Sequence, residues 1–89
     1  MSWKIQIEES AKMELSKLDA QVAIRILKFL HERVAKLDNP RSIGDPLKGS
    51  TFGDFWRYRV GDYRLICKIN DAKIEVIVVK IGHRSKVYR

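Results

Sequence analysis

The sequence predicts an α+β fold in which one strand, a helical hairpin and a three-stranded antiparallel meander follow one another, with the helices packed on one face of a small sheet. Three observations lead to this expectation. Apolar residues alternate near the start, an amphipathic helical stripe follows, and two runs rich in aromatic and β-branched residues flank a glycine turn at 61–62. A length of 89 residues suits a single domain, which we expect to span residues 1–89.

The first part of the chain has the pattern of a strand followed by two helices. Residues 3–8 alternate apolar and polar side chains, as a half-buried strand does. Ser10 is a candidate N-cap for a short helix ending near Leu18, and Asp19 can cap a longer helix that reaches Leu37. The longer helix carries an apolar stripe at spacings of three and four: Ala23, Ile26, Leu27, Leu30, Val34 and Leu37.

A connector separates the helices from the hairpin. Residues 38–49 carry the turn-forming sequences Asn39-Pro40 and Gly44-Asp45-Pro46, so we expect an irregular loop within the domain. The loop brings one cation, Lys48, close to the start of the hairpin.

The hairpin around residues 61–62 predicts two different faces. Glycine in the first position of a two-residue loop indicates a type II′ turn, which sets the pairing of the flanking residues. Side chains alternate between faces along each strand, so one face then carries Arg59 opposite Arg64 and Arg57 opposite Ile66. The other face is apolar, with the pairs Val60–Tyr63, Tyr58–Leu65 and Trp56–Cys67.

The facing arginines are costly without a partner. Like charges directly across a ladder are destabilising by about 0.2–1 kcal/mol, and arginine cannot lose its proton. A bound phosphate would turn the repulsion into charge-assisted hydrogen bonds, for which arginine is the preferred partner. The alternative is that both arginines lie over the sheet, stacking on neighbours or pairing with acidic residues elsewhere.

A second turn leads into the last strand. A two-residue turn at residues 71–72 pairs Asn70 with Lys73. The register then predicts these further pairs: Lys68 with Glu75, Cys67 with Val76, Leu65 with Val78, and Arg64 beside Val79. If the alternation persists, His83 shares the face of Arg64, and the end of the chain returns to the arginine side of the sheet.

The charge points to an anionic partner. Lys and Arg number 18 against 11 Asp and Glu, which gives a net charge of +7 and a pI near 9.8. This balance favours nucleic acid first and a membrane surface second. The second option is weak, because no apolar run approaches the ~18 residues of a spanning helix.

Other classes of protein are disfavoured by what the sequence lacks. A single cysteine, Cys67, excludes an internal disulfide and is expected in the core. No His, Cys, Asp and Glu cluster has the spacing of metal ligands, so we expect neither a metal nor a cofactor. The start of the chain lacks the apolar core of a signal peptide, so we expect a cytoplasmic protein.

Four blocks of sequence, with the order of elements, carry a resemblance to a known family. They are Leu47-Lys48-Gly49, Phe55-Trp56-Arg57-Tyr58-Arg59, Gly61-Asp62-Tyr63-Arg64-Leu65 and Gly82-His83-Arg84-Ser85-Lys86-Val87-Tyr88. The chain resembles the RelE/ParE superfamily of toxin–antitoxin toxins over nearly its whole length. It resembles the RelE-like branch in particular, because ParE-like relatives lack this residue set.

The resemblance implies a single RelE-like toxin domain that binds a cognate antitoxin and cleaves messenger RNA in the ribosomal A site through a basic sheet surface. The family's terminal cation falls on either His83 or Arg84, because the segment from Gly82 to Tyr88 is shorter than in the best-known member. The residues implied as catalytic are Arg59, Arg64, His83 and Tyr88, and those implied as substrate-binding are Lys48, Arg57 and Arg84.

Cleavage without a metal uses the 2′-hydroxyl as nucleophile on the adjacent phosphate, and needs a base, an acid and cations. The arginines supply charge but are poor bases, so His83 is the candidate for proton transfer, its alternative being a solvated loop residue. Tyr88 either transfers a proton, stacks on a nucleobase or only packs on the sheet. Two other functions stay open: a ParE-like inhibitor of DNA gyrase, and a non-catalytic module that binds RNA or protein.

Overall fold

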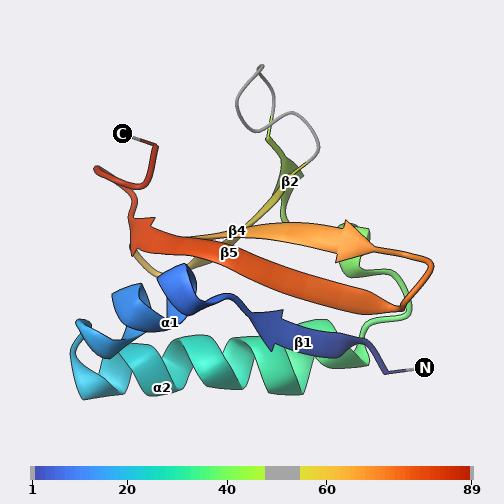
Figure 1. Ribbon diagram of the computed structural model, residues 1–89, viewed down its shortest axis with the longest axis horizontal. Helices are drawn as coiled ribbons and strands as arrows, with labels where there is room; N and C mark the ends of the chain where they lie inside the picture. Colours follow the sequence, from blue (N-terminus) through green and yellow to red (C-terminus); the bar gives the residue numbers. More distant parts are fainter. Residues whose placement is uncertain (1, 48–54, 89) are drawn as a thin grey trace.

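The computed structural model describes residues 2–47 and 55–88, which form a five-stranded mixed sheet with helices along one face (Figure 1). This arrangement confirms the predicted α+β class. The bounds are β1 Lys4–Ile7, α1 Glu9–Ser16, α2 Ala20–Lys28, a π-helical turn Phe29–Arg33, 3₁₀ turns Val34–Lys36 and Pro40–Ser42, β2 Asp45–Pro46, β3 Trp56–Val60, β4 Tyr63–Asn70 and β5 Glu75–His83.

The predicted helical hairpin is present, and the helical run that starts with α2 continues through its π and 3₁₀ turns to Lys36. The N-cap predicted at Ser10 is wrong, because α1 has Glu8 as its N-cap residue. The Ser10 hydroxyl instead donates to the carbonyl oxygen of Val79 on β5 (3.2 Å). Asp19 is the N-cap residue of α2, although its side chain makes no capping hydrogen bond.

The strand order is β1-β5-β4-β3-β2. The meander β3–β4–β5 is antiparallel as predicted, and β1 runs parallel to β5. A parallel pair needs a long crossover, which the helical hairpin supplies between β1 and the meander. The strand β2 was not predicted, since Asp45 and Pro46 lie in what was expected to be an irregular connector and pair with β3.

The main core lies between the sheet and the helices. Ile26, Leu30 and Val34 of the predicted apolar stripe are fully buried against it. Cys67 is buried here as predicted, and burial raises the pKa of its thiol. Burial also raises the pKa of Tyr58, whose hydroxyl donates to the carbonyl oxygen of Pro40. Among the described residues, no helix is long and apolar enough to cross a membrane.

The β3–β4 hairpin has the predicted register at each of its five pairs, from Val60–Tyr63 to Trp56–Cys67. Of its two turn residues, Gly61 alone has a positive φ (57°), which is the type II′ pattern. Arg59 therefore faces Arg64 across the ladder, and Arg57 faces Ile66.

The predicted β4–β5 register is wrong. The turn is longer than expected, with Ile74 at φ 51°, so that Asn70 pairs with Glu75. A bulge at Val79 then shifts the register by one more residue. The observed pairs replace all those predicted: Lys68 opposes Ile77, Cys67 opposes Val78, Leu65 opposes Ile81, Arg64 opposes Gly82 and Tyr63 opposes His83.

Candidate functional site

The face of the sheet away from the helices gathers cations from three strands. Cross-strand partners share a face, so the observed register places five cations on this side: Arg57 and Arg59 of β3, Arg64 and Lys68 of β4, and Lys80 of β5. We call it the cationic face. In Figure 1 the helices lie below the sheet, whereas β2 and the C-terminal segment rise from the opposite side.

A small apolar cluster anchors the C-terminal segment to the cationic face. Val87, Ile66 and Leu47 are buried together, with Phe55 and Val79 packed against them. Gly82 permits this contact, because a Cβ there would lie 3.1 Å from the Cβ of Val87. The predicted return of the chain end to the arginine side is therefore confirmed.

Arg57 joins three segments on this face. Its Nη1 donates to the Tyr88 hydroxyl (3.0 Å) and its Nη2 to Oδ2 of Asp45 (3.2 Å). The hydrogen bond to Tyr88, then that to Asp45, raises the pKa of Arg57 further above its ordinary value. The Arg57 side chain is only 22% exposed, and among the described residues its buried Nε has no hydrogen-bond partner. Its two other nitrogens are held by Tyr88 and Asp45.

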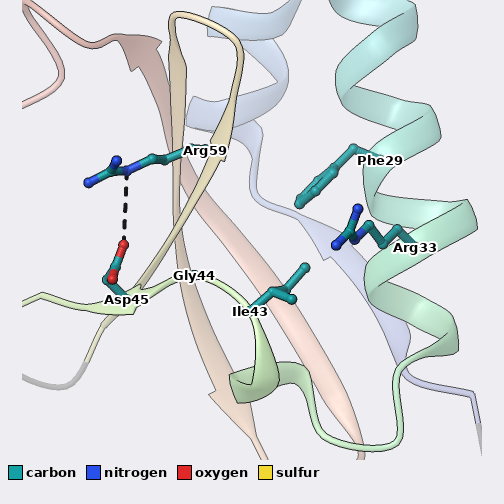
Figure 2. Close-up of a pocket in the computed structure, with 6 residues that line it drawn as sticks. All are labelled: Phe29, Arg33, Ile43, Gly44, Asp45 and Arg59. Carbon is teal, nitrogen blue, oxygen red and sulfur yellow. Dashed lines mark ion pairs between the residues drawn. The ribbon is translucent and has the colours of Figure 1, made fainter.

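Asp45 also pairs with Arg59, whose Nε lies 3.9 Å from the same Oδ2 (Figure 2). Arg59 remains 59% exposed. Across the ladder, Nη1 of Arg64 donates to the carbonyl oxygens of Gly61 and Tyr63, each at 3.0 Å. Arg59 therefore pairs with an acidic residue, which is one of the alternatives stated above for the two arginines. Arg64 instead donates to the backbone of the turn.

An open cavity of about 430 Å³ adjoins this cluster, between the helical run and the β2–β3 edge. Figure 2 shows its lining: Phe29, Arg33, Ile43, Gly44, Asp45 and Arg59. Asp45 and Arg59 are therefore shared between the cavity wall and the cationic face.

His83 lies elsewhere than expected. The bulge at Val79 puts it opposite Tyr63, whose ring it meets edge-on with centroids 5.6 Å apart, and Tyr63 packs on the main core. The prediction that His83 shares the face of Arg64 is wrong for this reason. His83 Nδ1 lies 3.2 Å from the backbone nitrogen of Ser85 and 2.8 Å from the Ser85 hydroxyl, so this nitrogen is held within the C-terminal segment.

The remaining predicted residues lie at the chain end and in the connector. Arg84 closes the C-terminal segment onto the hairpin turn, since its backbone N–H donates to the carbonyl oxygen of Asp62 (2.7 Å) and its Nε lies 3.8 Å from the Asp62 carboxylate. Lys48 lies outside the described residues. Tyr88 is 44% exposed, so its ring is available beside Arg57.

Comparison with known proteins decides the family. The model of the family described as "ParE toxin of type II toxin-antitoxin system, parDE" matches residues 5–88. The chain belongs to this family of toxins. It is 27% identical to toxin RelG of Mycobacterium tuberculosis over 89 residues, which cover 100% of this chain and 99% of RelG. It is 31% identical to the mRNA interferase toxin RelE of Escherichia coli over 90 residues, which cover 99% of this chain and 92% of RelE.

The fold of this toxin also matches a chain from the crystal structure of a RelBE toxin–antitoxin complex of M. tuberculosis. The TM-score is 0.85 at 22% identity, covering 97% of this chain and 95% of that chain. The family match, together with the 31% identity to RelE, confirms the predicted membership of the RelE/ParE superfamily.

Sequence reasoning about this toxin missed two residues of the cationic face. Asp45 was assigned to a loop because Gly44 and Pro46 flank it, and nothing local indicated that it meets two arginines. Lys80 was assigned to no face; the bulge places it opposite Ile66. The repulsion between Arg59 and Arg64 could have indicated Asp45, because two facing arginines favour a carboxylate nearby.

Proposed function

We propose that this toxin is a metal-independent, ribosome-dependent endoribonuclease that cleaves messenger RNA in the ribosomal A site and so inhibits translation in the cytoplasm. The observation that carries the proposal is the meeting of Arg57, Arg59 and Tyr88 on one exposed face of the sheet. The 31% identity to a toxin named mRNA interferase supports it.

Arg59 and Arg64 take the electrostatic role in the proposed reaction. The 2′-oxygen attacks the adjacent phosphorus as its proton passes to a base, and the bond from phosphorus to the 5′-oxygen breaks as that oxygen gains a proton. Negative charge grows on the phosphorane oxygens, where preformed cations act most strongly. Arg59 is exposed and faces Arg64 across the ladder. A phosphate above the pair would contact both guanidinium groups once Arg64 exchanges the carbonyl oxygens of Gly61 and Tyr63 for phosphate oxygens.

Tyr88 and His83 are the two candidates for proton transfer. The Tyr88 hydroxyl accepts a hydrogen bond from Arg57, so its own O–H can donate a proton to a substrate atom. His83 can act only on substrate that reaches over the end of the hairpin, where it packs against Tyr63. Arg57 positions Tyr88, while Arg84 and Lys48 are proposed contacts to the RNA backbone.

A cognate antitoxin is the second partner we propose, because the family is defined by toxin–antitoxin systems. A net charge of +7 suits an acidic, partly disordered segment that folds on binding. We expect it to cover the cationic face, and the test is co-purification of a small partner encoded beside this chain. Persistent toxicity with every neighbouring product supplied would contradict the pairing.

The alternative function is inhibition of DNA gyrase, which the name of the matching family favours. Induced expression of the toxin without an antitoxin separates the two. Cuts within translated regions of messenger RNA support the ribonuclease, whereas gyrase-linked DNA breaks with intact transcripts support the alternative. Growth arrest with neither kind of damage would leave a non-catalytic binding module.

A further inference from the structure

Asp45 places a carboxylate between the two cations of β3. Its Oδ2 lies 3.2 Å from Nη2 of Arg57 and 3.9 Å from Nε of Arg59. Figure 2 shows the Asp45 side chain directed toward Arg59, with both residues on the same side of the cavity. One anionic oxygen therefore serves two guanidinium groups of the cationic face.

The backbone around Asp45 holds this carboxylate in place. Gly44, at φ 84°, passes so close to β3 that a Cβ there would overlap the carbonyl oxygen of Arg57, so a larger residue does not fit. On one side the indole N–H of Trp56 donates to the carbonyl oxygen of Ile43 (2.8 Å). On the other, the backbone N–H of Leu47 donates to the carbonyl oxygen of Phe55 (2.9 Å).

Carboxylates and phosphates compete for arginine because both offer anionic oxygens to the same N–H groups. Asp45 is 49% exposed, so solvent and ligands reach it. Its contact with Arg59 is the longer one, and Arg59 is the more exposed of the two arginines. An incoming phosphate therefore meets Arg59 first and Nη2 of Arg57 second, while Nη1 of Arg57 keeps its hydrogen bond to Tyr88.

We propose that Asp45 is an internal counter-ion of the cationic face, which competes with phosphate for Arg57 and Arg59 and sets how strongly this face holds an anion. Without substrate the carboxylate neutralises part of the charge and reduces binding to unrelated polyanions. The identification of the phosphate as a phosphate of RNA rests on the proposed function. The competition between Asp45 and phosphate for the two arginines does not depend on that function.

Inorganic phosphate is the probe, because it tests the anion site without RNA chemistry. The free toxin is titrated with phosphate while the guanidinium N–H signals of Arg57 and Arg59 are followed by NMR. Asp45→Asn keeps the shape and removes the charge, and should lower the Kd for phosphate at these arginines about 3- to 10-fold. Asp71→Asn is the matched control. It makes the same change in net charge and removes the carboxylate that pairs with Arg41, but it does so in the β4–β5 turn and not beside Arg57 and Arg59. It should leave the phosphate Kd within about 2-fold.

If the Asp45→Asn and Asp71→Asn proteins bind phosphate with equal affinity, the proposed counter-ion role of Asp45 is wrong, whatever the result with RNA. Should Asp45→Asn fail to fold, Asp45→Ser makes the same test with a smaller neutral residue. If the wild type does not cleave messenger RNA, the proposed function is wrong. If Asp45→Asn nevertheless binds phosphate more tightly, the counter-ion role of Asp45 is supported.

Discussion

The two faces of the sheet satisfy their side chains in different ways. The helix-covered face buries Tyr58, Leu65 and Val78 in one continuous core. In the described part of the chain, the cationic face has a small apolar cluster beside arginines whose charges are met by Asp45 and by backbone carbonyls. Neighbouring residues on one strand thus belong to opposite sides. The difference teaches that stability depends on one face and the proposed function on the other, so substitutions should separate the two properties.

Leu30→Ala on the helix-covered side should have the largest effect on stability. Leu30 is fully buried, and truncating such a leucine costs about 2–5 kcal/mol of unfolding free energy through lost burial and a cavity. Urea denaturation measures it, with Met13→Ala, at a 63% exposed position, as the control. A loss at Leu30 no larger than at Met13 would mean that the core is not where the stability resides.

Arg59→Ala and Arg64→Ala should show the reverse pattern. Each removes charge stabilisation worth about 10²–10³-fold in rate, and stability should change by no more than about 0.5 kcal/mol, because a cross-strand repulsion disappears as well. Cleavage of messenger RNA by translating ribosomes measures the rate. Arg41→Ala, which removes an arginine paired with Asp71 at the β4–β5 turn, should cleave normally. Unfolded arginine variants would show that these side chains hold the sheet together.

Tyr88→Phe and His83→Ala sharpen the comparison, because the two residues lie on different faces. We expect Tyr88→Phe to slow cleavage about 10²-fold and His83→Ala to slow it less, since the Tyr88 hydroxyl lies beside Arg57. Tyr88→Ala removes the ring as well, so equal losses in the two Tyr88 variants assign the role to the hydroxyl. A harmless Tyr88→Phe would leave stacking, and a larger loss at His83 would return proton transfer to the histidine.

Alkaline pH should destabilise the protein through two buried groups of the helix-covered face, Tyr58 and Cys67. Burial raises the pKa of Tyr58 and of Cys67, so the folded state keeps both protons where the unfolded state loses them. Stability is therefore full below the ordinary pKa of each group, about 9 for the thiol and 10 for the phenol, and falls above it. The slope approaches about 1.4 kcal/mol per pH unit for each group. Urea denaturation at pH 8–11 measures it, and Tyr58→Phe should flatten the curve; an unchanged slope in that variant would contradict the assignment.

Turn length explains why one hairpin was predicted and the other was not. A glycine at 61 allows a two-residue turn, and that turn alone sets every pair of β3 and β4, including Arg59 with Arg64. The β4–β5 turn has no glycine, and Ile74 takes the positive φ instead. The local pattern at residues 70–75 favoured a shorter turn, and each pair predicted from it was therefore displaced.

The order of elements apart from β2, the helical stripe, the buried Cys67 and the arginine pair followed from the sequence alone. Each of these features depends on residues close together in the chain. The bulge at Val79 lies where β5 contacts α1: Ser10 donates to the Val79 carbonyl, and a Glu14 carboxylate accepts from the N–H of Ile81. The place of Asp45 between two arginines likewise depends on Gly44 lying against β3. These contacts join segments far apart in the chain, so only the tertiary structure decided which face carries His83 and what neutralises the cations.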